Sequence, residues 1–137
     1  MKLMYINGEF TQGKSNDVIE VTNPATEEVL DTIPRGTAKD IEAAVRAAKE
    51  AFDPWRKMGA NERANLMHEI AEKVHAHREE IIRLLTLEEG KPWSENDEEV
   101  EWVLNTFRYY AELGRHHRGS VLAAGSSSQF NFIIKEP

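Results

Sequence analysis

The chain has 137 residues, a size that fits one domain or a piece of a larger one, and a formal net charge of −7. This acidic balance argues against binding to nucleic acid or to an anionic membrane surface, because both require a basic surface. The sequence contains no cysteine, which excludes disulfides, thiolate metal sites and a cysteine nucleophile. With no signal peptide and no long apolar run, we expect a cytoplasmic protein.

The first 35 residues have the pattern of short strands separated by turns. Asn7-Gly8 is typical of a type I′ hairpin turn, because both residues accept a positive φ. Two further apolar segments, 18–21 and 29–33, end at Asn23-Pro24 and Pro34, and proline lacks the N–H that a strand ladder needs. The pattern predicts a small antiparallel meander over residues 3–34.

From Thr37 onward the apolar residues follow helical spacing. Thr37 and Asp40 resemble a capping box at the start of a helix. A stripe of apolar side chains follows on one face of this helix, and we expect the helix to end at Pro54. The stripe consists of Ile41, Ala44, Val45, Ala48 and Phe52. Altogether the sequence predicts four helices, at about 38–53, 60–76, 78–89 and 92–115.

The helix over 92–115 carries two apolar lines, so it needs two neighbours. We expect the first line to be buried; it comprises Val100, Val103, Leu104, Phe107 and Ala111. The second comprises Trp102, Tyr109 and Leu113. Residues 119–128 are rich in Gly, Ala and Ser and predict a loop, and residues 129–135 predict a strand. An apolar strand followed by only two residues leaves an unpaired edge, so we expect the chain to be part of a longer one. The expected fold class is α+β.

No complete catalytic site is found among the chemically active residues. His75 and His77 point in divergent directions on a helix, as do the adjacent His116 and His117, so we interpret them as surface residues. No glycine-rich phosphate loop and no Gly-x-Ser-x-Gly motif is present.

Seven segments nevertheless occur in an order and at spacings that are typical of one enzyme family. They are Ile6-Asn7-Gly8-Glu9-Phe10, Val21 to Leu30 around Asn23-Pro24-Ala25-Thr26, Asp40 to Phe52 followed by Trp55, Glu62-Arg63-Ala64 with Leu66, Thr86 to Pro92, Tyr109-Tyr110-Ala111 and Lys135-Glu136-Pro137. Together they resemble the N-terminal part of the NAD(P)-dependent aldehyde dehydrogenase superfamily.

The resemblance implies that residues 1–125 are the N-terminal part of a nucleotide-binding domain. Residues 126–137 would start a strand used in oligomerisation, or else an internal strand of the same domain. The implied reaction is oxidation of an aldehyde to a carboxylic acid, with NAD or NADP bound by the full-length parent. We expect no cofactor and no catalytic residue in this chain alone, because the family's nucleophile is a cysteine. The implied partners are the rest of the polypeptide and neighbouring subunits of a homo-oligomer.

The resemblance also implies a monovalent cation site. Many members of the family hold such an ion with backbone oxygens before the Asn-Pro turn and with an acidic residue before Gly-Lys-Pro. The matching positions here are Val21, Thr22 and Glu88, where the family more often has Asp in place of Glu88. The alternative is that Glu88 is a solvated carboxylate at a helix end.

Two other functions remain open from the sequence. One is a free-standing helical module that binds a protein partner through residues 92–115. The other is a truncated gene product without activity. Neither the aldehyde nor the choice between NAD and NADP follows from these residues.

Overall fold

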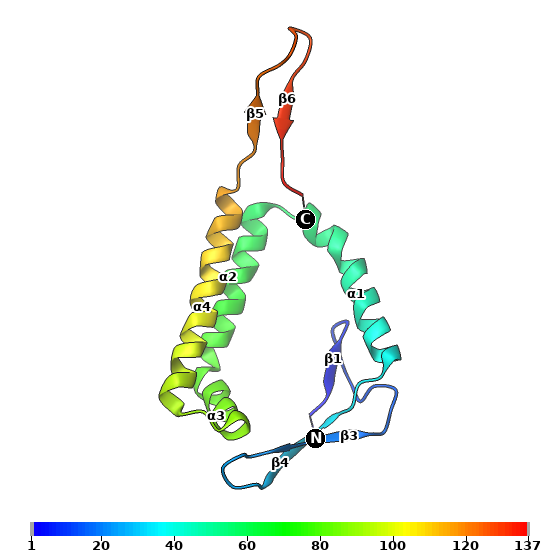
Figure 1. Cartoon of the computed structure of the whole chain (residues 1–137), viewed down its shortest axis with the longest axis vertical. Helices are drawn as coiled ribbons and strands as arrows, with labels where there is room; N and C mark the ends of the chain where they lie inside the picture. Colours follow the sequence, from blue (N-terminus) through cyan, green and yellow to red (C-terminus); the bar gives the residue numbers. More distant parts are fainter. Residues whose placement is uncertain (1, 137) are drawn as a thin grey trace.

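The structure is a computed structural model that describes residues 2–136. In this part of the chain it contains four helices and three two-stranded antiparallel sheets, arranged as an open ring from which one hairpin projects (Figure 1). The strands are β1 (Met4–Ile6), β2 (Glu9–Thr11), β3 (Val18–Thr22), β4 (Val29–Pro34), β5 (Ser120–Leu122) and β6 (Asn131–Ile133). The helices are α1 (Ala38–Lys57), α2 (Ala60–Ala76), α3 (Arg78–Glu89) and α4 (Trp93–His116). The expected α+β class and the four helices are confirmed.

The N-terminal strands form two separate hairpins. Asn7 and Gly8 join β1 to β2 with φ values of 54° and 83°, as a type I′ turn requires. β3 and β4 are joined by a turn in which the Asn23 side chain accepts a hydrogen bond from the backbone N–H of Ala25 at 2.9 Å. The short antiparallel strands predicted over residues 3–34 are therefore present, and they form two separate pairs. The loop between β2 and β3 runs to the start of α1, where Lys14 N–H donates to the Asp40 carboxylate at 3.3 Å.

Helix α1 begins with the predicted capping box. The Asp40 carboxylate accepts hydrogen bonds from the Thr37 backbone N–H at 2.8 Å and from the Thr37 hydroxyl at 2.6 Å. The expected end of this helix at Pro54 is wrong, because α1 continues to Lys57. The carbonyl of Pro54 still accepts a hydrogen bond from the backbone N–H of Met58 at 3.2 Å, so helical bonding continues past the proline.

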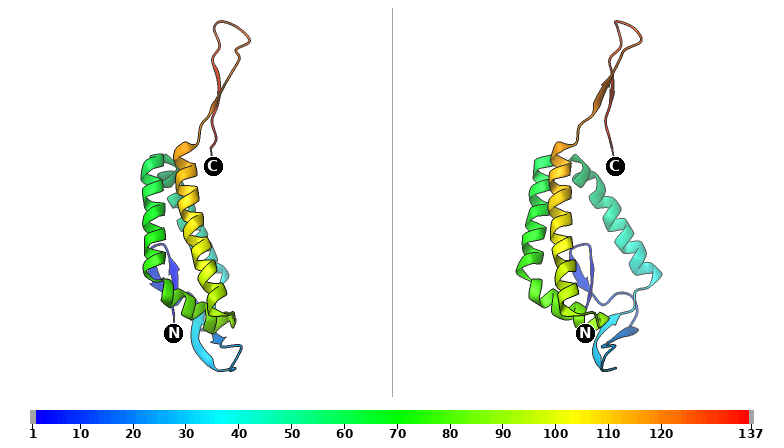
Figure 2. Two further views of the ribbon diagram at one scale, coloured as in Figure 1. Left: turned by 90° about the vertical axis from the view of Figure 1, so that its left-hand side faces the viewer. Right: turned by 60° about the vertical axis from the view of Figure 1, so that its left-hand side comes forward.

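The small core lies where α2 and α3 pack against α4. α2 and α4 run side by side in opposite directions in every view (Figures 1 and 2). The buried apolar residues of this core are Ala64, Ala71, Ile82, Val100, Leu104 and Ala111. The three alanines let the helix backbones approach closely. Val103, expected in this core, is instead 42% exposed because it lies on the flank of α4.

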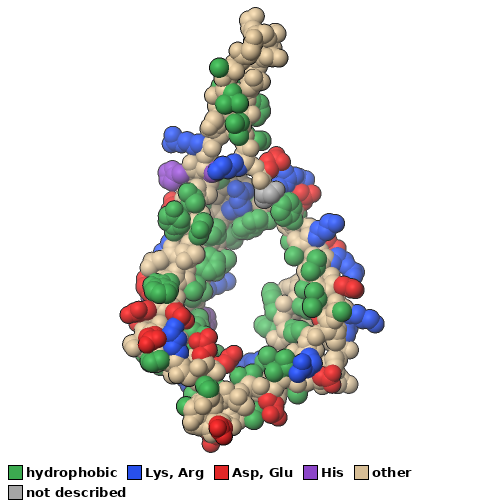
Figure 3. All heavy atoms as spheres, viewed as in Figure 1, with side chains coloured by type: hydrophobic (Ala, Val, Ile, Leu, Met, Phe, Trp, Pro, Cys, Tyr) green, Lys and Arg blue, Asp and Glu red, His purple; other side chains and the backbone are tan. Residues whose placement is uncertain are grey.

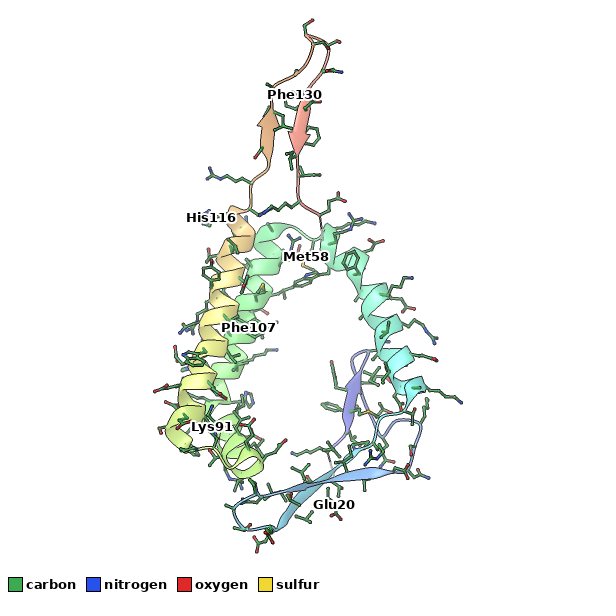
Figure 4. The ribbon with its side chains drawn as sticks, viewed as in Figure 1. Glu20, Met58, Lys91, Phe107, His116 and Phe130 are labelled. Carbon is green, nitrogen blue, oxygen red and sulfur yellow. The ribbon has the colours of Figure 1, made fainter. Side chains whose placement is uncertain are left out.

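A hairpin follows α4 and projects from the ring. β5 pairs with β6, so that Val121 lies opposite Phe132. Phe130 lies on this projecting hairpin, away from the ring (Figure 4). The predicted loop over 119–128 therefore contains a strand. Val121 and Leu122 of this strand form their backbone pairing with residues 131–133. The composition of the local sequence does not reveal such a partner. Within residues 2–136, no helix is both long and apolar enough to cross a membrane.

Candidate functional site

A pocket of about 480 Å³ lies between the β3–β4 hairpin and α3. Val21, near the end of β3, and Glu88, in the last turn of α3, both line it. Thr22 follows Val21 at the end of β3, but its side chain is exposed and does not line the pocket. The structure thus brings together two of the three residues predicted to hold a cation, with the third beside them.

Asp31 is a pocket residue that the sequence analysis missed. It lies on β4 directly opposite Val21 in the antiparallel register, and it lines the same pocket. The hairpin turn at Asn23-Pro24 carries the signal that could have found it, because the turn determines which residues face each other across the two strands. The register shifts between Val21 and Thr22, and such a bulge disrupts the regular pairing of backbone groups.

The charged residues of the pocket balance one another. Lys2 and Arg83 supply two positive charges, while Asp31 and Glu88 supply two negative charges, around an apolar wall. Across residues 2–136, no three His, Asp or Glu side chains are placed to hold a metal ion together. The pocket therefore places two carboxylates beside two cationic side chains, so its formal charges cancel.

Gly90 controls how closely α3 approaches the β3–β4 turn. It ends α3 in the left-handed conformation, with φ of 74°, and its N–H donates to the Thr86 carbonyl at 3.1 Å. A Cβ placed on Gly90 would lie 2.8 Å from Cγ of Pro24. Because Gly90 has no side chain, the turn can contact the end of the helix that carries Glu88.

The corner between α3 and α4 is held from inside by Asn96. This side chain is fully buried, and its amide nitrogen donates to the Thr86 hydroxyl at 3.0 Å and to the Lys91 carbonyl at 3.3 Å. On the surface of the same corner, Lys91 pairs with Glu99, and this hydrogen bond raises the pKa of Lys91. These contacts fix the end of α3, and Glu88 with it, relative to α4.

The other end of α3 is held by Arg78. Its guanidinium donates to the carboxylates of Asp97 at 2.7 Å and Glu101 at 2.8 Å, and to the Asp97 carbonyl at 3.1 Å. The hydrogen bond from Arg78 holds the pKa of Asp97 below its usual range. This ion-pair network joins α3 to α4, so its role is structural.

The histidines form no shared site in the described part of the chain. His68 pairs with Glu112 at 2.7 Å between α2 and α4, and His77 contacts the carbonyl of Lys73 at 2.9 Å. His75, His116 and His117 are exposed. These positions agree with the interpretation of His75, His77, His116 and His117 as surface residues.

The sequence and the fold both match known proteins. The model of the aldehyde dehydrogenase family matches residues 10–137 of the chain. The chain belongs to the aldehyde dehydrogenase family. Aldehyde dehydrogenase 1 of Tanacetum cinerariifolium is 36% identical in an alignment that covers 98% of this chain and 27% of that relative. The D-glyceraldehyde dehydrogenase (NADP⁺) of Picrophilus torridus is 34% identical over 134 residues, again 98% of this chain and 27% of the relative.

Solved structures of the aldehyde dehydrogenase family share this fold. Betaine aldehyde dehydrogenase from Staphylococcus aureus, in complex with NAD⁺, matches 99% of the chain at a TM-score of 0.93 and 32% identity. Succinate-semialdehyde dehydrogenase from Burkholderia pseudomallei matches all of it at a TM-score of 0.94 and 31% identity. In both cases the chain covers 28% of the solved protein, and it corresponds to the N-terminal part. The chain therefore spans little more than a quarter of the length of the relatives that it matches.

Proposed function

We propose that this chain is the N-terminal part of the nucleotide-binding domain of an enzyme that oxidises an aldehyde to a carboxylic acid with NAD or NADP. The observation that carries the proposal is the match of nearly the whole chain to the N-terminal part of aldehyde dehydrogenases. One such relative is solved with NAD⁺, and another is named for its use of NADP⁺.

The chain by itself is proposed to be inactive. The reaction needs a thiolate that attacks the aldehyde, a hydride acceptor, and water that hydrolyses the resulting thioester. This chain has no cysteine, and its net charge of −7 would repel the phosphates of a dinucleotide. Calorimetric titration of the chain with NAD and with NADP should show no saturable binding, and aldehydes should give no reduced cofactor. Binding at micromolar concentrations, or turnover above a protein-free control, would contradict this proposal.

A chimeric enzyme tests the positive part of the proposal. The chain would replace the matching segment of the Picrophilus torridus relative, which is 34% identical to it, so that one polypeptide carries this N-terminal part and the rest of that enzyme. We expect D-glyceraldehyde-dependent reduction of NADP⁺. The relative with its own N-terminal segment is the positive control. An inactive chimera beside an active control would contradict the proposed function.

The pocket between β3 and α3 is proposed to hold a monovalent cation in the longer enzyme. The ligands would be the backbone oxygens of Val21 and Thr22 and the carboxylate of Glu88, with further ligands from polypeptide beyond this chain. Support comes from the shared pocket of Val21 and Glu88 and from the bulge at Val21 and Thr22. Glu88→Gln in the chimera should weaken the dependence of its stability on Na⁺ or K⁺ relative to a choline salt. An unchanged dependence would contradict the cation site.

The projecting hairpin is proposed to pair with a neighbouring subunit of a homo-oligomer in the cytoplasm. The β5–β6 pair is isolated, and two-stranded sheets are marginally stable alone. Phe130 and Phe132 are 73% and 60% exposed, which gives the hairpin apolar side chains for a partner to cover. Truncation of the chimera's hairpin should reduce its oligomer to a smaller species in analytical ultracentrifugation. An unchanged sedimentation profile would contradict this proposal.

A further inference from the structure

The turn of the β1–β2 hairpin contains the one asparagine of the sequence that is followed by glycine. Asn7 and Gly8 are the two central residues of this turn, because Ile6 pairs with Glu9. Both central residues are exposed. Apart from the adjacent residues, a Cβ placed on Gly8 would have only the Tyr5 hydroxyl within 4 Å, at 3.9 Å, in the described part of the chain. The Asn7 side chain and the Gly8 nitrogen are therefore open to solvent.

An asparagine in such a position is chemically labile. The Gly8 nitrogen, deprotonated by hydroxide from the solvent, can attack Cγ of Asn7, and the side-chain nitrogen takes a proton from water and leaves as ammonia. Water then opens the resulting succinimide at either of its two carbonyl carbons, which leaves aspartate or isoaspartate at position 7. The net reaction consumes water and releases ammonia, and nothing is oxidised or reduced. Glycine favours the attack because it places no Cβ beside the reacting nitrogen.

The hairpin must loosen before this ring can close. Asn7 has a φ of 54° and Gly8 a φ of 83°, the positive values that a type I′ turn requires. A succinimide holds the bond between Cα and the carbonyl carbon of Asn7 in another orientation, so the ring cannot form inside the closed turn. β1 and β2 form a sheet of their own, and a sheet of only two strands is marginally stable. Local opening of this hairpin therefore costs little free energy.

One aromatic pair opposes the opening. Tyr5 and Phe10 lie directly opposite each other on the two strands, and their rings meet edge to face with centroids 5.2 Å apart. The two residues are 65% and 73% exposed. The hairpin borders the opening of the ring of elements, which remains open when all atoms are drawn as spheres (Figure 3). The contact between these two rings is therefore a main restraint on the hairpin.

We propose that Asn7 is a deamidation site, where solvent water converts the asparagine to aspartate or isoaspartate at a rate set by the opening of the β1–β2 hairpin. Isoaspartate adds one carbon to the main chain inside the two-residue turn, so a hairpin that has reacted in this way does not close again. The proposal goes beyond the proposed function and does not depend on it.

Asn16 offers a matched comparison within the same chain. It is also exposed and lies in a loop. The residue that follows it, Asp17, has a side chain, and its backbone N–H donates to the hydroxyl of Ser15 at 3.0 Å. The nitrogen that would attack the Asn16 side chain is thus both shielded and hydrogen-bonded, whereas Gly8 has no side chain to shield its nitrogen.

Incubation of the chain at mildly alkaline pH, in water enriched in heavy oxygen, tests the assignment. Peptide mass spectrometry would follow Asn7 and Asn16 in the same sample. We expect Asn7 to lose ammonia and gain one heavy oxygen roughly tenfold faster than Asn16, because glycine follows only Asn7. The Asn7 peptide should also separate into an aspartate and an isoaspartate form. Equal rates at the two positions would overturn the proposal.

Two phenylalanine variants test the dependence on hairpin opening. Phe10→Ala removes the ring opposite Tyr5 and should raise the deamidation rate of Asn7 about threefold. Phe130→Ala is the matched control, since it removes an equally exposed ring that contacts Phe132 on the β5–β6 hairpin, and it should leave the Asn7 rate unchanged. A rate that Phe10→Ala leaves unchanged, or that both variants raise equally, would overturn the assigned role of hairpin opening.

The isoaspartate form, once separated, tests the lasting effect on the hairpin. Proton NMR should show the contact between the rings of Tyr5 and Phe10 in the unreacted chain and not in the isoaspartate form. A contact that persists in the isoaspartate form would overturn the inference that the reacted hairpin stays open.

Discussion

Some residues that lie where two elements meet allow fewer side chains and backbone conformations than other residues of the same type. Gly90 needs both a positive φ and an empty Cβ position next to Pro24. Gly114, by contrast, lies inside α4 with no atom within 4 Å of the place where a Cβ would stand. The same substitution should therefore have opposite effects at the two glycines.

Gly90→Ala should destabilise the chain by about 2 kcal/mol, because the added methyl strains the backbone and pushes on Pro24. Gly114→Ala should stabilise it by roughly 0.5 kcal/mol, because alanine is the better helix former. Urea unfolding followed by circular dichroism measures both. Equal effects of the two substitutions would contradict the role assigned to the contact between Gly90 and Pro24.

Asp40 makes the stability of the start of α1 depend on pH. Hydrogen bonds from Thr37 and Lys14 hold the pKa of Asp40 below its ordinary value of 3.8. Because the folded state favours the ionised form, the stabilisation is present above that ordinary value and is lost as the pH falls through the lower pKa of the folded state. Asp40→Asn should therefore be less stable than the unsubstituted chain at pH 7. The difference in free energy of unfolding between the two proteins should narrow below about pH 3.8. A difference that stays constant down to acidic pH would show that the carboxylate charge is not involved.

At the scale of whole elements, local patterns predicted the helices well because their boundaries depend on nearby residues. The capping box at Thr37 and Asp40 marks the start of α1, and Gly90 marks the end of α3. The strand β5 was missed because its only ladder partner lies nine residues or more away in the chain. Asp31 was missed at the candidate site for the same reason, since its place beside Val21 follows from pairing across the hairpin. Glu88 was proposed from the family resemblance, through its position before Gly-Lys-Pro, and Val21 and Glu88 line one pocket.

Arg78 should matter more than other surface arginines for the packing of α3 on α4. It donates to two carboxylates and one carbonyl, whereas Arg108 makes one hydrogen bond to Glu72, at 3.2 Å, between α2 and α4. Arg78→Gln should lower the midpoint of thermal unfolding, and Arg108→Gln should change it little. In Arg78→Gln the pKa of Asp97 should also rise toward its ordinary value, as measured by carboxyl NMR. An unshifted pKa would contradict the pairing of Arg78 with Asp97.

At the scale of the whole molecule, the chain exposes more large apolar side chains than it buries. The second apolar line of α4 is open, with Trp102 66% and Tyr109 63% exposed, and so are Phe130 to Ile134 at the hairpin. Exposed apolar surface of this extent favours association. We therefore expect the isolated chain to dimerise or aggregate through these surfaces. Light scattering that shows a stable 15.6 kDa monomer across micromolar concentrations would contradict this expectation.

The uncovered stripe of α1 also bears on the order in which the protein folds during synthesis. α2, α3 and α4 bury Ile82 and Leu104 among themselves, so they can pack as soon as they have left the ribosome. α1 is made before them, yet its large apolar side chains, such as Ile41 and Val45, stay exposed in the described part of the chain. Hydrogen-exchange labelling of nascent chains should therefore show protection in α2 to α4 before α1. Until then α1 is an exposed amphipathic helix of the kind that a chaperone can hold.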